Sequence, residues 1–248
     1  MTTPRVSIVI PAYNEGDDIV PGLRRIFEAI KLDAEVLVVV DTDTDTTIPA
    51  VEKFAKAEPR LRYLINDYGR GPAQAIRYGI DHAGAATVVV TMADGCDDPR
   101  QIDDLVRLVE RGVVVAAASR YMPGGQQVGG PRFKSFLSRT AGKSLYTFAD
   151  AGTRDATNSF KAYNRQFVRD VGIDSRDGFE IGLELTAKAR RLRMPVAEIP
   201  TIWLDRAFGE SNFKLSKWIP KYFKWYRFAF GRQLTLDELA EKTGTLSS

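Results

Sequence analysis

The stretch Ala85–Ser119, AATVVVTMADGCDDPRQIDDLVRLVERGVVVAAAS, decides the fold. It begins with small and β-branched residues that predict a buried strand, and it ends with an apolar run, VVVAAAS, that predicts another. Between them, PRQIDDLVRLVERG has apolar residues at helical spacing. Strand, helix and strand in this order form the unit from which parallel α/β sheets are built.

The same alternation extends toward the N-terminus. Strands are expected in RVSIVI, AEVLVVV and LRYLIN, and each is followed by a helical segment: GDDIVPGLRRIFEAI, TTIPAVEKFAKA and GPAQAIRYGIDHA. The strands are mostly apolar instead of alternating with polar residues, which is typical of a parallel sheet covered on both faces. We therefore predict an α/β, Rossmann-like fold with a mostly parallel sheet and helices on both faces.

The pattern changes after Ser119. RYMPGGQQVGGPR contains four glycines and two prolines, so we expect a long loop, and such loops inside compact domains are usually functional. Two amphipathic helices are expected in FKSFLSRTAGKSLYTFA and DGFEIGLELTAKARRL, and one late strand in PVAEIPTIWL.

Composition excludes several classes of protein. The 248 residues suit one large α/β domain or two small ones, and the net charge of +3 is too small to indicate a nucleic-acid binder. One cysteine excludes an intrachain disulfide and a cysteine-based zinc site, and one histidine argues against a histidine-rich metal site. Met1–Pro4 lead directly into a strand, and no apolar run approaches the ~20 residues that cross a bilayer. We therefore expect a cytoplasmic protein without a signal peptide.

Acidic and polar side chains follow several of the predicted strands. They are Tyr13 and Glu15 after the first strand, Asp41, Asp43 and Asp45 after the second, Asp94, Asp97 and Asp98 after the fourth, and Ser119 and Arg120 after the fifth. Ligands of open parallel sheets bind beyond the carboxyl ends of the strands. Carboxylates from several strands suit a nucleotide and a hard divalent cation, Mg²⁺ or Mn²⁺.

Some of these carboxylates have simpler interpretations. Asp98 before Pro99 has the pattern of a helix N-cap followed by an N1 proline, and we prefer this role to metal ligation. Asp45 is similarly interpreted as a turn or cap residue. Asp94 follows a buried strand with no helix start beside it, so it remains the leading ligand candidate.

Eight segments in order resemble the family-2 glycosyltransferases, which have the GT-A fold. They are VSIVIPAYNE, EVLVVVDTDTDTT, GRGPAQAIRYGI, VVVTMADGCDDP, SRYMPGG, DATNSFKAYNR, GFEIGLEL and DRAFGESNFKL, and they cover nearly all of residues 5–215. The later segments are most similar to polyprenyl-phosphate sugar synthases, such as the dolichol-phosphate mannosyltransferases. By contrast, the first strand is not followed by the G-x-G-x-x-G turn of nicotinamide-dependent oxidoreductases.

The resemblance implies roles for individual residues. Pro11, Tyr13 and Glu15 match the loop that holds base and ribose, and Val39 and Asp41 match the strand end that reads the base. Arg120 matches an arginine that faces phosphate, and Arg132 or Lys134 would supply a second cation for an acceptor phosphate. Glu184 matches an acidic residue beneath the acceptor site, and Arg206 and Ser211 match an element near the donor phosphates.

The chain departs from the family at its acidic loop. Aligned on Met92 and Pro99, the usual Asp-Ala-Asp is replaced by Ala93-Asp94-Gly95. We infer a rebuilt metal site from Asp94 and Asp97. Asn212 also stands where relatives often have a lysine.

The resemblance implies inverting transfer of a sugar from a nucleotide donor, with metal and arginine stabilising the leaving diphosphate. Asp94, Asp97, Arg120 and Arg206 are the candidate catalytic residues. An acceptor phosphate needs orientation only, whereas a hydroxyl acceptor needs a base, for which Asp94, Asp97 and Glu184 are candidates. A degenerate nucleotide-sugar-binding protein is the non-enzyme alternative.

The C-terminal segment has its own pattern. We divide the chain into a catalytic domain, 1–212, and an amphipathic, basic segment, 213–248. Apolar residues recur at helical spacing in KLSKWIPKYFKWYRFAFGR, with Pro220 expected to start or kink the helix. Trp and Tyr beside Lys suit either a helix packed on the domain or an anchor at an anionic membrane surface through residues 213–232.

Overall fold

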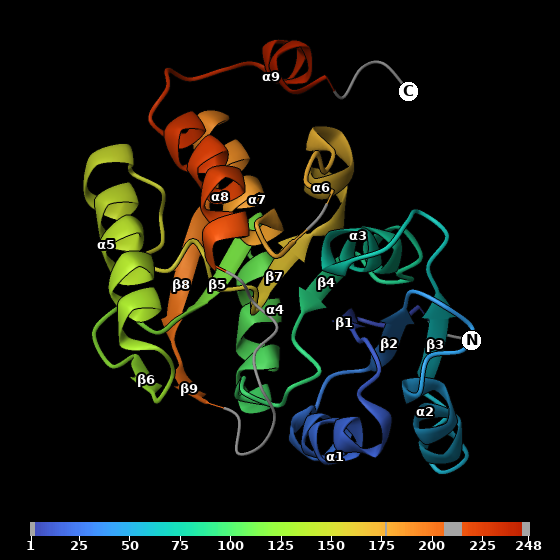
Figure 1. The fold of residues 1–248 in the computed structure, drawn as a ribbon. Helices are drawn as coiled ribbons and strands as arrows, with labels where there is room; N and C mark the ends of the chain where they lie inside the picture. The colour runs from blue at the N-terminus through green and yellow to red at the C-terminus, as the bar shows by residue number, and fades with distance from the viewer. Residues whose placement is uncertain (1–2, 177, 206–214, 245–248) are drawn as a thin grey trace.

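The computed structural model describes residues 3–176, 178–205 and 215–244 of the chain. A seven-stranded sheet has the order β3-β2-β1-β4-β7-β5-β8 (Figure 1). Its strands are β1 (Val6–Pro11), β2 (Ala34–Val40), β3 (Leu61–Ile65), β4 (Thr87–Val90), β5 (Val115–Ser119), β7 (Lys161–Asn164) and β8 (Val196–Pro200). All neighbours are parallel except at β7, which is antiparallel to β4 and β5. The predicted mostly parallel sheet is confirmed.

Helices cover both faces of the sheet, as predicted. On one face lie α1 (Ile19–Ala29), α2 (Thr47–Ala55) and α4 (Ile102–Glu110), and on the other lie α3 (Pro72–Asp81), α6 (Arg165–Val171) and α7 (Ile181–Arg191). Short 3₁₀ turns, Gly16–Asp18 and Pro99–Gln101, precede α1 and α4. The strands carry apolar residues on both faces because each face is buried under one helical layer.

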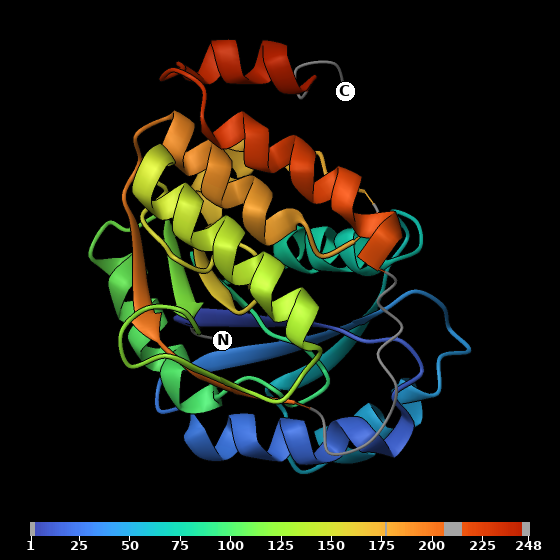
Figure 2. The same cartoon turned by 60° about the vertical axis from the view of Figure 1, so that its left-hand side comes forward.

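Three helices form a further layer at one end of the sheet. Helices α5 (Arg132–Ala149) and α8 (Leu215–Ala229) pack with α7 (Figure 2) around a separate apolar cluster that includes Leu145, Leu183, Trp225 and Ala229. Pro220 lies inside α8, so the helix does not start there. The last helix, α9 (Leu236–Thr243), begins with a capping box. Within the described ranges, no helix is long and apolar enough to span a bilayer.

A strand and the helix after it lie where the sequence pattern predicted no element. Strand β7 and helix α6 follow one another in KAYNRQFVRDV. Strand β7 has only four residues, and it contains a lysine and an asparagine, so it lacks the apolar run that identified the other strands. It is nevertheless buried, with Lys161 fully inaccessible to solvent.

The late strand predicted in PVAEIPTIWL is two strands. Its first half is β8, and its second half is β9 (Ile202–Leu204), which pairs with β6 (Gln126–Val128) from the predicted long loop. Thr201 separates them: its N–H donates to the Ser119 carbonyl, and its own carbonyl accepts the N–H of Gln126. The single-strand prediction was wrong because one residue changes hydrogen-bonding partners between two sheets.

Two glycines inside helices provide a test of the packing. A Cβ at Gly79 in α3 would lie 2.4 Å from Val9 Cγ1 in β1, whereas a Cβ at Gly22 in α1 would meet its nearest atom at 3.7 Å. Gly79→Ala should therefore lower the free energy of unfolding by about 1 to 3 kcal/mol through overpacking. Gly22→Ala is the control and should raise it by up to about 1 kcal/mol through helix propensity. Urea unfolding measures both, and equal effects would contradict this packing.

Candidate active site

Three loops meet at the carboxyl edge of the sheet. Because β1 lies between β2 and β4, the loops after these strands, 12–15, 41–46 and 91–98, are neighbours. Strand β5 stands apart, since β7 separates it from β4. The rim therefore has an acidic half over β1, β2 and β4, and a second half over β5 that begins with Arg120.

The first two loops are tied together by hydrogen bonds. The backbone N–H of Asn14, a residue with a positive φ of 52°, donates to both carboxylate oxygens of Asp45 at 3.0 and 3.1 Å. Asp45 also accepts the N–H of Thr47, and Thr47 Oγ1 accepts the N–H of Glu15. The predicted turn role of Asp45 is confirmed. Tyr13 stands on this tied loop with 66% of its surface exposed.

Asp41 is fixed by the loop that precedes α3. Its Oδ1 accepts from Asn66 Nδ2 at 3.1 Å, and its Oδ2 accepts from Gly71 N at 2.8 Å. Each carboxylate oxygen can accept more than one hydrogen bond, so this geometry leaves Asp41 able to accept a further N–H, such as that of a nucleotide base. Val39 differs, because its side chain is fully buried and its carbonyl accepts the N–H of Ala12. Its side chain therefore supports the strand end from inside the sheet.

The three aspartates of the acidic loop, residues 91–98, lie in different environments. Asp98 caps the 3₁₀ turn by accepting the N–H of Arg100 and pairs with its guanidinium, which lowers the pKa of Asp98. The predicted cap is confirmed. Asp94 accepts the N–H of Cys96 at 3.1 Å. Asp97 is buried and accepts the Thr91 hydroxyl at 2.8 Å, and burial, with Asp94 adding repulsion, raises the pKa of Asp97 to about 6.

The pair Asp94 and Asp97 has the chemistry of a partial divalent-cation site. The negative charge of Asp94 is close enough to disfavour the ionised form of Asp97, so a cation between them would relieve the repulsion. In the described part of the chain, no group of three or more His, Cys, Asp or Glu side chains could hold a metal ion. Two carboxylates fit Mg²⁺ or Mn²⁺ when substrate phosphates and water supply the remaining oxygens.

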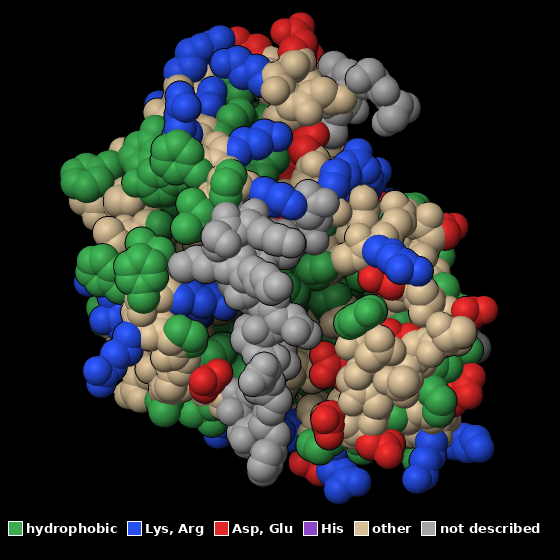
Figure 3. Space-filling view, viewed as in Figure 1, with side chains coloured by type: hydrophobic (Ala, Val, Ile, Leu, Met, Phe, Trp, Pro, Cys, Tyr) green, Lys and Arg blue, Asp and Glu red, His purple; other side chains and the backbone are tan. Residues whose placement is uncertain are grey.

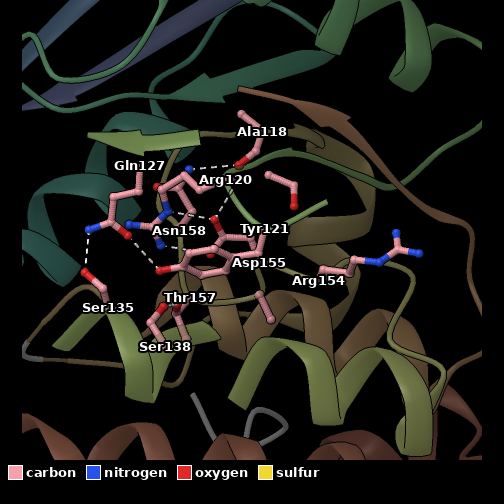
Figure 4. Close-up of polar contacts among 12 residues, drawn as sticks. Ala118, Arg120, Tyr121, Gln127, Ser135, Ser138, Arg154, Asp155, Thr157 and Asn158 are labelled. Atoms are coloured by element: carbon pink, nitrogen blue, oxygen red, sulfur yellow. Dashed lines mark hydrogen bonds and ion pairs between the residues drawn. The ribbon is translucent and has the colours of Figure 1, made fainter. Parts of the chain in front are cut away.

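Arg120 forms a bidentate ion pair with a buried aspartate from a distant segment. Its Nε and Nη2 lie 2.7 and 2.8 Å from the two carboxylate oxygens of Asp155, which also accepts the backbone N–H of Arg120 (Figure 4). Burial acts to lower the pKa of Arg120, but the ion pair outweighs it and holds this pKa above its ordinary value. Arg120 is therefore a fixed, permanently charged group.

Lys161 stabilises the turn that carries Asp155. Its side chain is fully buried, and its ammonium donates to the carbonyls of Ala156 and Asn158, in the turn that carries Asp155. Burial lowers the pKa of Lys161 to about 7, although Asp155 acts in the opposite direction. Asn158 adds a hydrogen bond to the Ala118 carbonyl, which ties the turn to β5 (Figure 4).

A side-chain relay connects Arg120 to helix α5. The Tyr121 hydroxyl donates to Gln127 Oε1 at 3.0 Å, and Gln127 Nε2 donates to Ser135 Oγ at 2.7 Å (Figure 4). The guanidinium carbons of Arg120 and Arg139 lie 4.9 and 5.3 Å from the centre of the Tyr121 ring. Arg139, on α5, is thus a second cation near Arg120 that sequence reasoning did not select.

The other predicted acceptor residues have varied positions. Arg132 and Lys134 lie in the first turn of α5, and Arg132 is exposed. Glu184 is fully buried: its carboxylate accepts the N–H groups of Asp174 and Ser175 and pairs with Lys188. This geometry gives Glu184 a structural role and argues against contact with an acceptor. Arg206 and Ser211 lie outside the described residues.

Three partners of the site were missed from the sequence: Asn66, Asp155 and Lys161. Asn66 and Asp155 are separated from the residues they hold by 25 and 35 positions, and no local pattern joins them. The only available signal was the segment DATNSFKAYNR, which contains both Asp155 and Lys161.

Two solved structures illustrate the architecture that this chain shares with known proteins. A mannosyltransferase from Pyrobaculum calidifontis, in complex with GDP-Man and Mn²⁺, has a TM-score of 0.62 at 20% identity over 98% of this chain and 70% of that one. A glucosyl-3-phosphoglycerate synthase from Mycobacterium tuberculosis, in complex with Mn²⁺, UDP-Glc and phosphoglyceric acid, has a TM-score of 0.67 at 16% identity over 94% and 81% of the two chains. The fold is therefore of the GT-A class.

Sequence comparison identifies the family within this class. Residues 7–172 match the family model Glycosyl transferase family 2. The chain belongs to this family and is a glycosyltransferase, as the resemblance of its motifs implied.

The similar curated proteins share one acceptor type in their names. A polyprenol monophosphomannose synthase of Mycolicibacterium smegmatis is 28% identical over 87% of both chains. An undecaprenyl-phosphate mannosyltransferase of Micrococcus luteus is 30% identical over 84% of this chain and 87% of its own. A dolichol-phosphate mannosyltransferase of Pyrococcus furiosus is 28% identical over 85% of this chain but only 59% of its own length.

The buried ion pair predicts coupled stability effects. Arg120→Gln would leave the Asp155 carboxylate buried without its cation and should lower the free energy of unfolding by about 3 to 5 kcal/mol. Asp155→Asn should be similarly harmful. The double substitution should cost less than the sum of the two, as measured by denaturant unfolding in a double-mutant cycle. Additive losses would show that the two side chains do not interact in solution.

Asp97 predicts a pH dependence. Its folded-state pKa of about 6 lies above the ordinary 3.8, so its contribution to stability is present below pH ~4 and is lost as the pH rises through ~6. In metal-free buffer, the free energy of unfolding of the parent relative to Asp97→Asn should therefore fall by up to about 3 kcal/mol between pH ~4 and ~7. Asp98→Asn, the control, should show little slope over this range, because the pKa of Asp98 is lowered and its contribution is lost only below pH ~4. Parallel pH profiles for the parent and Asp97→Asn would contradict the assignment.

Proposed function

We propose that this glycosyltransferase inverts the anomeric centre of a hexose while moving it from a nucleotide sugar, of the GDP-mannose or UDP-glucose type, to a polyprenyl phosphate. One observation carries the acceptor assignment: the loop that begins with the fixed cation Arg120 leads directly into α5, a helix with exposed phenylalanines and no acidic residue. A phosphate-binding group thus stands beside a surface suited to lipid. The names of the similar proteins support the same acceptor.

The donor would bind over the acidic half of the rim. We assign base and ribose to the loop of Pro11, Tyr13 and Glu15, and a base N–H to Asp41, whose carboxylate is already oriented. Asp94 and Asp97 would hold a Mg²⁺ or Mn²⁺ ion, which when bound supplies charge stabilisation for the leaving diphosphate. Arg206 and Ser211 are proposed to act near the same phosphates.

The acceptor phosphate would bind over the other half. It is already ionised near neutral pH, so it needs orientation and no base. Arg120 is suited to this role because Asp155 fixes its guanidinium while leaving Nη1 outside the bidentate pair. Arg132 and Lys134 remain the proposed second cations, and Arg139 joins them through its contact with Tyr121.

We propose that α5 and α8 together face an anionic membrane surface. Helix α5 carries four basic and no acidic residues, and Phe133, Phe136 and Phe148 on it are 65, 64 and 78% exposed. Helix α8 also has four basic and no acidic residues, with Phe223 exposed. Figure 3 shows apolar and basic side chains intermixed over α5. Exposed aromatic rings among cations are typical of interfacial helices. Residues 213–248 would thus form the membrane-facing extension of a catalytic domain, 1–212.

A hydroxyl acceptor is the second candidate, and one observation favours it. The pKa of Asp97, raised to about 6, is closer to neutral than that of an ordinary carboxylate and would suit a general base. Glu184 is no longer a candidate for this role because it is fully buried.

Transfer assays with matched acceptors test the proposal. The full chain is incubated with labelled GDP-mannose or UDP-glucose, with Mn²⁺ or with EDTA, and with a polyprenyl phosphate, the corresponding polyprenol or a soluble glycan. We expect transfer to the polyprenyl phosphate only, loss of activity in EDTA, and an inverted anomeric configuration by NMR. Transfer to the polyprenol or the glycan would instead establish the hydroxyl acceptor, and no transfer at all would reject both.

The membrane surface has its own test. Replacing the exposed Lys143 and Lys224 with Gln should weaken binding to anionic vesicles by about 1 kcal/mol per charge, measured by co-sedimentation. Replacing the exposed Lys53 and Lys56 on α2 removes the same charge from another face and is the control. Equal losses from the two variants would show that binding depends on total charge and not on this surface.

A further inference from the structure

Helix α1 and strand β9 donate hydrogen bonds to the backbone of the acidic loop. Three consecutive carbonyls of the loop accept hydrogen bonds from these segments. Arg25 Nη1 donates to Gly95 O at 2.7 Å, the Leu204 N–H donates to Cys96 O at 3.2 Å, and Arg25 Nη2 donates to Asp97 O at 3.4 Å. One guanidinium on α1 therefore connects two carbonyls that flank the β9 contact.

Helix α1 lies close against this loop. A Cβ at Gly22 would be 3.7 Å from the Ala93 carbonyl oxygen and 3.9 Å from Gly95 Cα. Gly95 itself has a φ of +67°, a conformation that glycine adopts readily and other residues adopt rarely. Arg25 thus donates to the carbonyl of a residue with a left-handed backbone conformation.

The contact with Arg25 also brings a positive charge close to the aspartates of the loop. Three carboxylates lie within five residues of this loop, and like charges this close repel one another. Arg25 places a positive charge beside the loop. It does so without occupying the carboxylates, because its hydrogen bonds go to carbonyls.

We propose that Arg25 is a positioning residue that fixes the separation of Asp94 and Asp97 for the divalent cation. The planar guanidinium presents two N–H groups at a set spacing, so it fixes the carbonyls of residues 95 and 97 relative to each other. A lysine ammonium lacks this fork. The inference rests on the metal site in the proposed function, but it does not depend on the identity of the acceptor. Arg25 touches neither cation nor substrate, and it acts through the loop backbone.

The test uses metal binding and does not require turnover. The melting temperature is measured against Mn²⁺ concentration in the presence of GDP, and again with UDP, for the parent, Arg25→Met, Arg25→Lys and Arg24→Met. Arg24 is the neighbouring exposed arginine on α1 and is the matched control. Because groups that orient metal ligands typically contribute 10- to 100-fold in affinity, Arg25→Met should raise the half-saturating Mn²⁺ concentration by at least about tenfold. Arg25→Lys should be intermediate, and Arg24→Met should match the parent.

The melting temperature without metal separates positioning from general stability. Arg25 is exposed, so Arg25→Met should fold and melt close to the parent in EDTA. A lower melting temperature in EDTA with an unchanged Mn²⁺ midpoint would overturn the inference, as would equal midpoints for Arg25→Met and Arg24→Met. If Mn²⁺ does not stabilise the parent with either nucleotide, the metal site and this inference both fail. If Mn²⁺ midpoints shift as expected but no polyprenyl phosphate is glycosylated, the acceptor assignment fails and Arg25 keeps its role.

Discussion

The ion pair between Arg120 and Asp155 is the interaction on which one half of the rim depends. Opposite charges removed from water are tolerated only when their remaining hydrogen-bonding groups are satisfied. Asp155 meets this condition by also accepting the backbone N–H of Arg120, while Lys161 binds carbonyls of the same turn. The antiparallel direction of β7 makes this possible. Because β7 is antiparallel to β5, the turn that precedes β7 and carries Asp155 lies at the carboxyl end of β5. If β7 were parallel to β5, the turn that follows β7 would lie there instead.

The acidic half of the rim is organised differently. Most of its carboxylates are committed to backbone N–H groups close in space: Asp45 to Asn14, Asp41 to Gly71 and Asp98 to Arg100. These bonds fix the loops by satisfying backbone N–H groups that would otherwise lack a partner. Asp97 is the exception, since burial and Asp94 raise its pKa. A cation is proposed to bind at Asp94 and Asp97, and the hydrogen bonds of the other acidic residues hold the loops beside them.

Local pattern and long-range pairing explain what the sequence could and could not predict. Strands β1 to β5 were predictable because each is a largely apolar run between turn residues, although the edge strand β3 is only partly buried. Asp98 was predictable because an N-cap and its proline are adjacent. Strand β7 was missed because Lys161 and Asn164 make it look polar, although its environment is buried. The partner of Arg120 lies 35 residues away, so only the fold brings it there. For Glu184 the family resemblance implied a place beneath the acceptor site, and the structure shows a buried carboxylate that binds backbone N–H groups.

The proposed lipid acceptor requires a hydrophobic chain and a charged phosphate to be accommodated within a short distance. Burial and the charge of Glu180 raise the pKa of Tyr222 on helix α8, and the charge of Arg120 has a smaller effect in the opposite direction. Tyr222 is therefore close enough to Arg120 to sense its charge. Helix α5 is connected to this region too, through the relay from Ser135 to Tyr121. Helix α5 thus reaches the Arg120 half of the rim, and both helices also carry exposed aromatic rings. A lipid held by this arrangement would keep its chain at the interface while its phosphate reaches Arg120, so the enzyme would need no spanning helix to act on it.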